Sequence, residues 1–298
     1  MNEHRSSVDA DERSGREIIR QESAVSVSSE TETPRFEELY RAEESHFWFQ
    51  SRACVIGEVF RRLQRHLENG YRVLEVGCGT GKVLSVLEDV CRDGEVIGAE
   101  LHREGVEFAR KRVNCRVVQG NVYRLPFSLP FDLIGMFDVL EHLDDDRGAL
   151  DCLYSSLKPG GAAVLTVPAH MALWSFRDVA AEHCRRYSPS GLREKLEASG
   201  FEVEYLSQFM APLVPVMWLS RRVSALLARF RSKKAREPME MAIRELKVVP
   251  VLNRLLGWLL RLEAPLVARQ RILPVGTSLL AVARKPKLAG ELGNQKAA

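Results

Sequence analysis

The sequence lacks the features that would indicate a membrane span, a secretory signal or a cysteine-bound zinc ion. It has no run of about 18 uncharged apolar residues, which a membrane-spanning helix needs. Its best apolar run, residues 206–220, holds two prolines and ends before two arginines. No two of its six cysteines have Cys-x-x-Cys spacing, so no zinc site or redox motif is predicted. The N-terminal residues are polar, without the apolar core of a signal peptide. We therefore expect free thiols and a cytoplasmic protein.

The net charge is small but unevenly distributed. The formal net charge of the 298 residues is +3, which by itself indicates no partner. From Ala211 to the C-terminus there are 17 Lys and Arg against 5 Glu and no Asp, whereas the first 34 residues lean acidic. This asymmetry favours a C-terminal surface that meets an anionic partner such as lipid or nucleic acid.

Strands and helices alternate through the middle of the chain. Residues 1–34 are polar and predict a disordered tail, and residues 35–70 have a helical apolar pattern. Strands are expected at 71–76, 95–100, 115–119, 131–137, 162–167 and 201–206, with helices at 82–90, 103–113, 145–157 and 188–199. Residues 211–274 are helical, apolar and basic, and 275–285 hold a last strand before a flexible tail at 286–298. This order predicts an α/β fold with a mainly parallel sheet that helices cover on both faces.

A glycine-rich turn follows the first strand. The segment Val73–Gly81 reads VLEVGCGTG and places glycines at Gly77, Gly79 and Gly81. A dinucleotide-binding turn has Gly-x-Gly-x-x-Gly spacing, and its third glycine would fall at Lys82 instead. The spacing therefore favours a ligand other than a dinucleotide at the carboxyl end of this strand.

Four later segments accompany the turn in a fixed order. Glu100 ends the second strand, about 20 residues after the turn, and QGNVYRLPF follows the third strand. The segments FDLIGMFDVLEHLDDD and LKPGGAAVLTVP cover the fourth and fifth strands. Together these segments resemble the class I S-adenosylmethionine (SAM)-dependent methyltransferase family, in particular its type 11 or ubiquinone-methyltransferase-like members. The resemblance covers about residues 35–209 and the last strand. It implies a seven-stranded Rossmann-like sheet in the order 3-2-1-4-5-7-6, with the helical segment inserted between strands 6 and 7.

The resemblance also implies which residues hold SAM. In the family the turn binds the methionine part, which corresponds here to Glu75, Gly77, Cys78, Gly79 and Gly81. An arginine that some members direct to the SAM carboxylate corresponds to Arg52.

The nucleoside part of SAM is assigned in the same way. Glu100, followed by Leu101, would accept hydrogen bonds from the ribose hydroxyls. Asn121 stands where the family usually has an aspartate near the adenine amino group, and an amide oxygen can still accept that proton. Val122 would pack on the adenine, and the backbone of Phe137 would pass the methionine end.

Methyl transfer needs an aligned acceptor and, for some acceptors, a base. Histidine suits this task near neutral pH, and we expect His142 and His183 to be catalytic, with His170 and Glu141 as further candidates. His142 has an alternative role in helix capping or packing. Asp138, Glu141 and His142 also resemble the metal-assisted subset of ubiquinone-type O-methyltransferases, but we expect no metal.

Two neighbouring segments carry alternatives. Arg185 and Arg186 could hold an anionic acceptor or form ion pairs in a loop. The aromatic residues 46–49 are costly to expose, and we interpret residues 35–70 as a lid over the cofactor, the alternative being a helix that packs on the sheet.

The inserted segment has a broad apolar face over Val248–Val267 and a basic run over Arg229–Arg236. Basic amphipathic helices can lie in a membrane interface. We weigh peripheral contact of 211–274 with the inner membrane, or a greasy acceptor pocket, against a hairpin buried on its own core or in a dimer.

The function that these features predict is methyl transfer from SAM to a small-molecule or lipid-like acceptor, by O- or C-methylation. Two alternatives are a catalytically silent SAM-binding scaffold or sensor and an NAD(P)-dependent oxidoreductase. No nucleic-acid partner is expected, because the sequence lacks an Asn-Pro-Pro-Tyr-type signature and stacking aromatics in the basic region.

Overall fold

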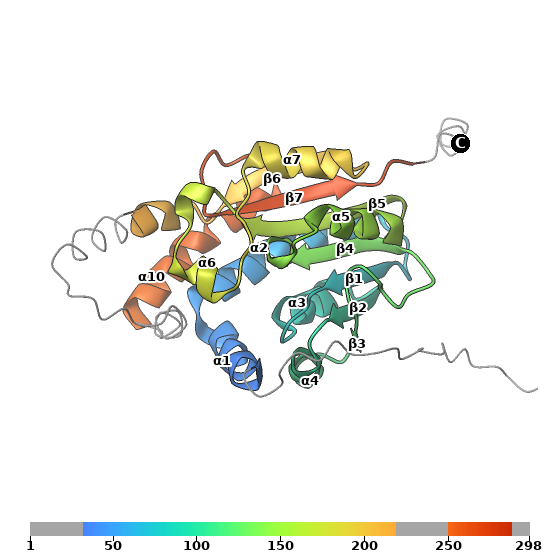
Figure 1. The fold of residues 1–298 in the computed structure, drawn as a ribbon, viewed down its shortest axis with the longest axis horizontal. Helices are drawn as coiled ribbons and strands as arrows, with labels where there is room; N and C mark the ends of the chain where they lie inside the picture. The colour runs from blue at the N-terminus through green and yellow to red at the C-terminus, as the bar shows by residue number, and fades with distance from the viewer. Residues whose placement is uncertain (1–31, 219–249, 288–298) are drawn as a thin grey trace, which may run out of the picture.

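One twisted sheet organises the fold. A computed structural model describes residues 32–218 and 250–287. Its strands are β1 Arg72–Val76, β2 Glu95–Glu100, β3 Arg116–Gln119, β4 Phe131–Phe137, β5 Leu157–Pro168, β6 Glu202–Phe209 and β7 Ser278–Arg284. They lie in the order β3-β2-β1-β4-β5-β7-β6, and β7 runs antiparallel to both of its neighbours (Figure 1). The predicted fold class and strand order are therefore confirmed.

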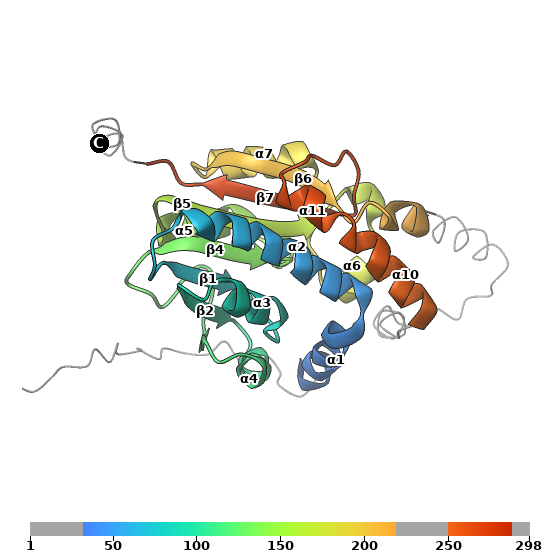
Figure 2. The ribbon, with the colours of Figure 1, turned by 180° about the vertical axis from the view of Figure 1, so that it is seen from behind.

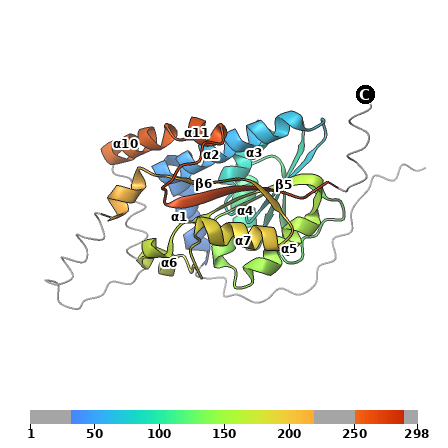
Figure 3. The same cartoon turned by 90° about the horizontal axis from the view of Figure 1, so that it is seen from above.

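Helices cover both faces of the sheet. The described helices are α1 Glu32–Ser45, α2 Phe47–Leu63, α3 Lys82–Val90, α4 Arg103–Arg112, α5 Asp146–Ser156, α6 Phe176–Ala180, α7 Pro189–Ala198, α10 Pro250–Arg261 and α11 Ala264–Ala268. Short 3-10 turns are η1 Gln64–His66, η2 Leu140–His142 and η3 Met171–Leu173. Viewed from above, α2, α10 and α11 lie on one side of the sheet, and α5 and α7 lie on the other (Figure 3).

Each face has its own apolar core. Ile56 and Phe60 of α2 are fully buried on one face, together with Leu84 of α3. On the other face, Leu150 of α5 and Leu192 of α7 are fully buried. Strands that are buried on both sides need apolar residues at nearly every position, which explains the continuous Val, Leu and Ile runs of the central strands.

The structure adjusts several predicted boundaries. α1 begins at Glu32, inside the segment expected to be a disordered tail, and α2 begins at Phe47, so the aromatic segment is its first turn rather than a connection. The Lys-Pro-Gly-Gly segment belongs to β5, where the pairing with β4 is irregular. The sequence analysis assigned no element between β5 and α7, where η3 and α6 lie.

Most of the inserted segment that the structure describes is helical. Residues 213–218 are helical, and α10 and α11 follow after residues 219–249, which lie outside the described part of the chain together with 1–31 and 288–298. The basic run Arg229–Arg236 therefore lies outside the described residues. Among the described helices, none is long and apolar enough to cross a membrane.

Asp146 links α5 to the chain around α7. Its carboxylate is buried and accepts hydrogen bonds from the Tyr187 hydroxyl at 2.9 Å and from Lys195 at 2.8 Å, while Arg185 lies 2.8 Å away. Although burial opposes it, the hydrogen bonds from Lys195, Arg185 and Tyr187 hold the pKa of Asp146 below its usual value. This network fixes the loop after β5 against the sheet.

We expect Asp146→Ala to lower the free energy of unfolding by about 2–3 kcal/mol, because it leaves two cations and a hydroxyl without their partner. A carboxyl with a lowered pKa contributes stability above its ordinary value and loses it as the pH falls through the folded-state pKa. The difference from the wild type should therefore shrink at pH values below about 4. Urea unfolding measures both effects.

Asp151, on the exposed side of α5, provides the matched control. Asp151→Ala should change the free energy of unfolding by no more than about 0.5 kcal/mol. If both variants lose the same free energy of unfolding, the buried network of Asp146 contributes no more to stability than the exposed Asp151 does.

Candidate cofactor and acceptor site

The glycine turn after β1 presents bare backbone at the carboxyl edge of the sheet. Gly77, Gly79 and Gly81 have φ values of 73°, 53° and 83°, which favour glycine. A Cβ on Gly77 would lie 2.4 Å from a methyl carbon of Val139, so that position is closely packed. A Cβ on Gly79 would meet nothing within 4 Å. The turn is thus packed at its first glycine and open at its second, where a ligand can approach the backbone. Cys78, between these two glycines, is buried in the core.

Glu100 is fixed beside this turn by backbone hydrogen bonds. Its carboxylate accepts the Gly79 N–H at 2.8 Å and the His102 N–H at 2.9 Å. Each oxygen keeps a second lone pair for a ligand hydroxyl. Leu101, the next residue, is half exposed, which leaves an apolar surface next to the carboxylate.

Glu75 and Arg52 each bring an unsatisfied polar atom to the same region. Glu75 precedes Val76, the last residue of β1, and is buried, and its Oε2 has no hydrogen-bond partner. Burial raises the pKa of Glu75 well above its usual value, and the nearby Arg52 acts in the opposite direction. Arg52, on α2, pairs with Asp138 and lies over the Trp48 ring at 4.8 Å, but its Nε has no partner. A buried acceptor and a buried donor without hydrogen-bond partners lower the stability of the protein unless a ligand bonds to them.

The remaining predicted cofactor residues occupy the expected strand ends. Asn121 follows β3, and its Oδ1 accepts the Tyr123 N–H at 3.0 Å, which leaves one lone pair of that oxygen. Val122 is buried in the core on the α5 side of the sheet. Phe137 ends β4 and turns its ring into the core beside Phe60, so only its backbone faces the edge of the sheet.

Two histidines and two carboxyl groups meet on the other side of this edge. His183 places Nδ1 3.1 Å from Oδ1 of Asp178 and Nε2 3.9 Å from Oε1 of Glu141. The rings of His142 and His183 lie edge to face, with centroids 4.7 Å apart. Both predicted catalytic histidines are therefore brought together, and Glu141 lies beside them.

Asp178 determines how His183 is presented. Besides His183 it receives Nε of Arg186 at 2.6 Å and the N–H of Ser175 at 2.7 Å. Although burial opposes it, the bonds from His183 and Arg186 hold the pKa of Asp178 below its usual range. An ionised Asp178 accepts the Nδ1 proton, so the neutral ring of His183 has its free lone pair on Nε2.

The sequence analysis did not identify Asp178, although a signal for it exists. Ser175 and Asp178 form a capping box at the start of α6, and Ser-x-x-Asp is the sequence signature of that motif. The buried carboxylate of Asp178 thus forms part of the N-terminal cap of α6 and also orients the ring of His183.

Glu141 is buried with both carboxyl oxygens unpartnered. Burial, and then the nearby Asp138, raise the pKa of Glu141 well above its usual value. Glu141, His142 and His183 can also each offer one ligand atom within 4.8 Å of the others. A divalent metal ion could therefore bind here, although the sequence analysis predicted no metal.

The arginines of the same loop are engaged within the protein. Arg185 lies 2.8 Å from Asp146 and donates to the Asp144 carbonyl at 3.0 Å. Arg186 donates twice to Asp178 and is almost completely buried. These contacts favour the ion-pair alternative over the binding of an anionic acceptor. His170 lies 2.6 Å from the side-chain oxygen of Gln208, so it has a structural partner as well.

The segment that the sequence predicts to be a lid consists of two different helices. α2 packs on the sheet through its buried side chains. α1 instead rests on the glycine turn and α4, because Glu43 is buried and bonds to Thr80 and Arg112. Arg112 also lies 4.0 Å from the Tyr40 ring. A lid function for 35–70 stays a prediction, and α1 is the part whose contacts suit it.

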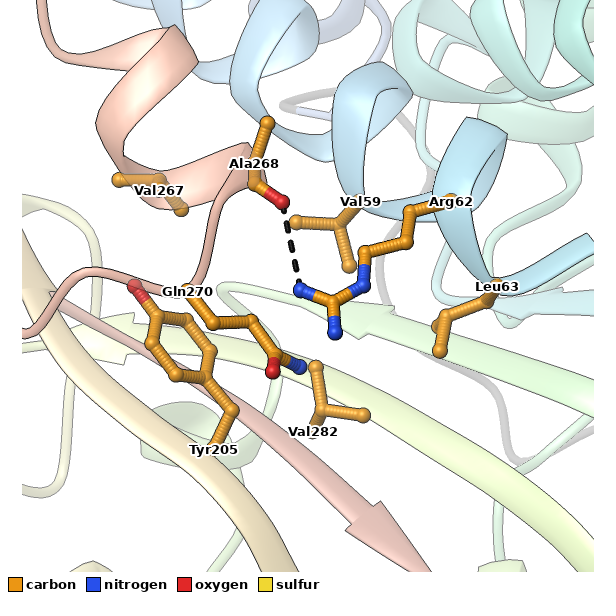
Figure 4. A pocket seen from close by; sticks show the side chains of 8 residues that line it. All are labelled: Val59, Arg62, Leu63, Tyr205, Val267, Ala268, Gln270 and Val282. Atoms are coloured by element: carbon orange, nitrogen blue, oxygen red, sulfur yellow. Dashed lines mark hydrogen bonds between the residues drawn. The ribbon is translucent and has the colours of Figure 1, made fainter.

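A small cavity elsewhere is no acceptor site. It lies between α2, α11, β6 and β7, where Arg62 donates to the Ala268 carbonyl at 3.4 Å (Figure 4). Its volume of about 10 Å³ is room for one water.

Comparison with known proteins identifies the family. A family described as "Methyltransferase domain" matches residues 48–206. A probable SAM-dependent methyltransferase of Mycolicibacterium smegmatis is 32% identical over 165 residues, which are 54% of this chain and 62% of that protein. A ubiquinone biosynthesis O-methyltransferase of Idiomarina loihiensis is 27% identical over 42% of this chain and 54% of its own. The matches thus span about half to three fifths of these curated relatives.

Solved structures share the fold. The complex of the Haloferax volcanii Trm112 methyltransferase activator with a putative methyltransferase matches 88% of this chain and 100% of its own, with a TM-score of 0.55 and 18% identity. Haemonchus contortus phosphoethanolamine N-methyltransferase 2, solved with SAM, matches 87% of this chain and 59% of its own, with a TM-score of 0.53 and 17% identity. The family match, the strand order and the glycine turn lead to one conclusion: the chain belongs to the class I SAM-dependent methyltransferase family, and SAM is its cofactor.

Proposed function

We propose that the protein transfers the methyl group of SAM to a small-molecule or lipid-like acceptor, and that His183 removes the acceptor proton. The observation that carries this proposal is the pair of orphaned groups, Glu75 and Arg52, on the same strand edge as the Asp178–His183 pair. Glu75 and Arg52 suit a zwitterionic ligand, and Asp178 and His183 suit a proton transfer.

The residues present fit SAM. Its methionine end carries an ammonium and a carboxylate, which Oε2 of Glu75 and Nε of Arg52 would satisfy. Glu100 keeps lone pairs for the ribose hydroxyls, and the open space at Gly79 lets the ligand reach the backbone. Leu101, Asn121 and Val122 would flank the adenine.

The chemistry divides between cofactor and protein. Bound SAM would supply an electrophilic methyl group on a sulfonium, with a neutral thioether as the leaving group. The protein aligns the acceptor in line with that bond. Nε2 of His183 takes the acceptor proton, and the ionised Asp178 stabilises the imidazolium that forms.

Glu141 and the edge of His142 would line the acceptor side of His183. A buried carboxyl group with a raised pKa can donate a hydrogen bond to an acceptor oxygen. This arrangement supports O-methylation of a phenol-like hydroxyl, or C-methylation next to one. The names of two relatives, a ubiquinone biosynthesis O-methyltransferase and a demethylmenaquinone methyltransferase, make quinol-type compounds the first acceptors to screen.

We expect Glu75→Gln to weaken SAM binding at least about tenfold, because a neutral amide replaces the carboxylate that faces the ammonium. The same variant should raise the stability of the SAM-free protein at neutral pH. A carboxyl with a raised pKa takes up a proton on folding, so it costs stability as the pH rises past its ordinary value. Calorimetric titration and thermal unfolding at several pH values measure the two effects.

Glu95→Gln is the matched control, since Glu95 begins β2 at the opposite edge of the sheet. It should leave SAM affinity unchanged. If Glu75→Gln binds SAM as tightly as the wild type, the assignment of Glu75 to the methionine ammonium is wrong.

We expect His183→Asn to lower kcat by about 10²–10⁴ with a hydroxyl acceptor while SAM affinity stays unchanged. His66→Asn, an exposed histidine in η1, controls for the substitution itself. Release of S-adenosylhomocysteine is the readout.

The same assay separates the alternatives. SAM binding without turnover on any acceptor would favour the silent scaffold or sensor. Loss of activity with a chelator, restored by a divalent cation, would assign Glu141, His142 and His183 to a metal ion and remove His183 as the base.

A further inference from the structure

The exposed apolar side chains of the described residues gather in one region. Ten of the fifteen large apolar side chains that are exposed there belong to residues 216–275. Five of them define what we call the α10 outer face: Val251, Leu252, Leu255, Trp258 and Leu262, with exposed fractions of 81%, 48%, 52%, 60% and 54%. Apolar surface in such a contiguous patch marks an interaction site rather than scattered surface residues.

The outer face is separate from the side of α10 that packs. Leu256 and Leu260 are buried against the rest of the protein. Asn253 bonds to the Phe47 N–H and to the Ser45 carbonyl, both at 2.8 Å. Val251, Leu255, Trp258 and Leu262 recur at helical spacing on a different side. α10 therefore has apolar side chains on its packed side and also on its exposed side, and packing on the rest of the protein accounts only for the first. The described residues leave the α10 outer face exposed.

The outer face lies at the functional end of the molecule. Both side views show α10 beyond the edge to which the parallel strands point, on the same end as α1 (Figures 1 and 2). The contacts of Asn253 join α10 to the first turn of α2, the helix that carries Trp48 and Arg52. A surface that meets the outer face would thus also lie close to the start of α2.

The charges around the face match an anionic surface. Arg254 and Arg261 are exposed on α10 beside the apolar side chains, and Arg269 and Arg271 follow α11. Within the described stretch 250–275 the acidic residue is Glu263, which is buried and accepts the N–H groups of Met210 and Ala211. The neighbouring sequence 219–249 contains nine Lys and Arg against three Glu. Within 250–275 no exposed carboxylate would pair the arginines of two such faces in a twofold dimer.

We propose that the α10 outer face docks on an anionic lipid bilayer, with α10 lying in the plane of the interface. Such helices insert their apolar side to about 5–10 Å, place tryptophan at the headgroup level and keep arginine in contact with lipid phosphates. The docking itself is independent of methyl transfer. Its consequence, that a lipid-like acceptor reaches the site from the membrane, rests on the proposed function.

The test is cosedimentation of the full-length protein with vesicles of phosphatidylcholine, alone or mixed with phosphatidylglycerol. We expect binding to the anionic vesicles, weaker binding to the neutral ones, and a loss of binding as salt screens the arginines. Leu255→Gln should lower the partition coefficient about tenfold, since one buried leucine is removed from the interface.

Leu129→Gln is the matched control, because Leu129 is as exposed as Leu255 but precedes β4 at the opposite end of the sheet. It should bind vesicles like the wild type. Circular dichroism and SAM titration confirm that both variants are folded.

Three results would overturn the proposal: no binding to anionic vesicles at low salt, equal loss in the Leu129 and Leu255 variants, or a dimer in solution that Leu255→Gln dissociates without any vesicle binding. The last result would assign the face to a second copy of the chain. Vesicle binding without methyl transfer would count against the proposed function alone and leave the docking intact.

Discussion

The burial of Glu75 at the end of β1 is the constraint around which the site is arranged. Its Oε2 has no hydrogen-bond partner among the described residues, and β1 is held between β2 and β4 inside the sheet. A buried unsatisfied carboxyl group costs stability. The fold tolerates that cost because Arg52 lies nearby and because the adjacent turn is open at Gly79. Family membership identifies SAM as the ligand, and the orphaned atoms of Glu75 and Arg52 are where its two charges would be received.

The two halves of the site are held by different means. On the cofactor side, backbone N–H groups position Glu100, and a buried pair between Glu43 and Arg112 holds α1 on the turn. On the acceptor side, Asp178 positions His183, and Asp146 anchors the same loop to α5. In both halves a buried carboxylate with several hydrogen bonds orders a segment outside the sheet. The unsatisfied carboxyl groups, Glu75 and Glu141, are the ones to which we assign ligands in the proposal.

Much of this arrangement could be predicted from the sequence. Strands buried on both faces appear as apolar runs, and the glycine spacing excludes a dinucleotide turn, so the sheet and the position of Glu100 follow from local pattern. The exposure of the α10 outer face could not be read in the same way, because an amphipathic period does not reveal which side meets the core.

The acceptor side of the site was harder to predict from the sequence for a similar reason. The contact between Asp178 and His183 joins a helix cap to a loop residue, and the partner of Arg186 depends on how that loop folds back. Sequence pattern located the histidines, but the groups that orient them are set by tertiary contacts. The capping signature of Ser175 and Asp178 marked a helix start without indicating that the same carboxylate faces a histidine.

The most direct measurement of the central claim is calorimetric titration of the protein with SAM and, separately, with NADH, for the wild type and for Glu100→Gln. The account predicts that SAM binds, that NADH does not, and that the variant binds SAM at least about tenfold more weakly, because an amide replaces the carboxylate that would accept the ribose hydroxyls. Binding of NADH without binding of SAM, or SAM binding that is indifferent to Glu100→Gln, would contradict the account.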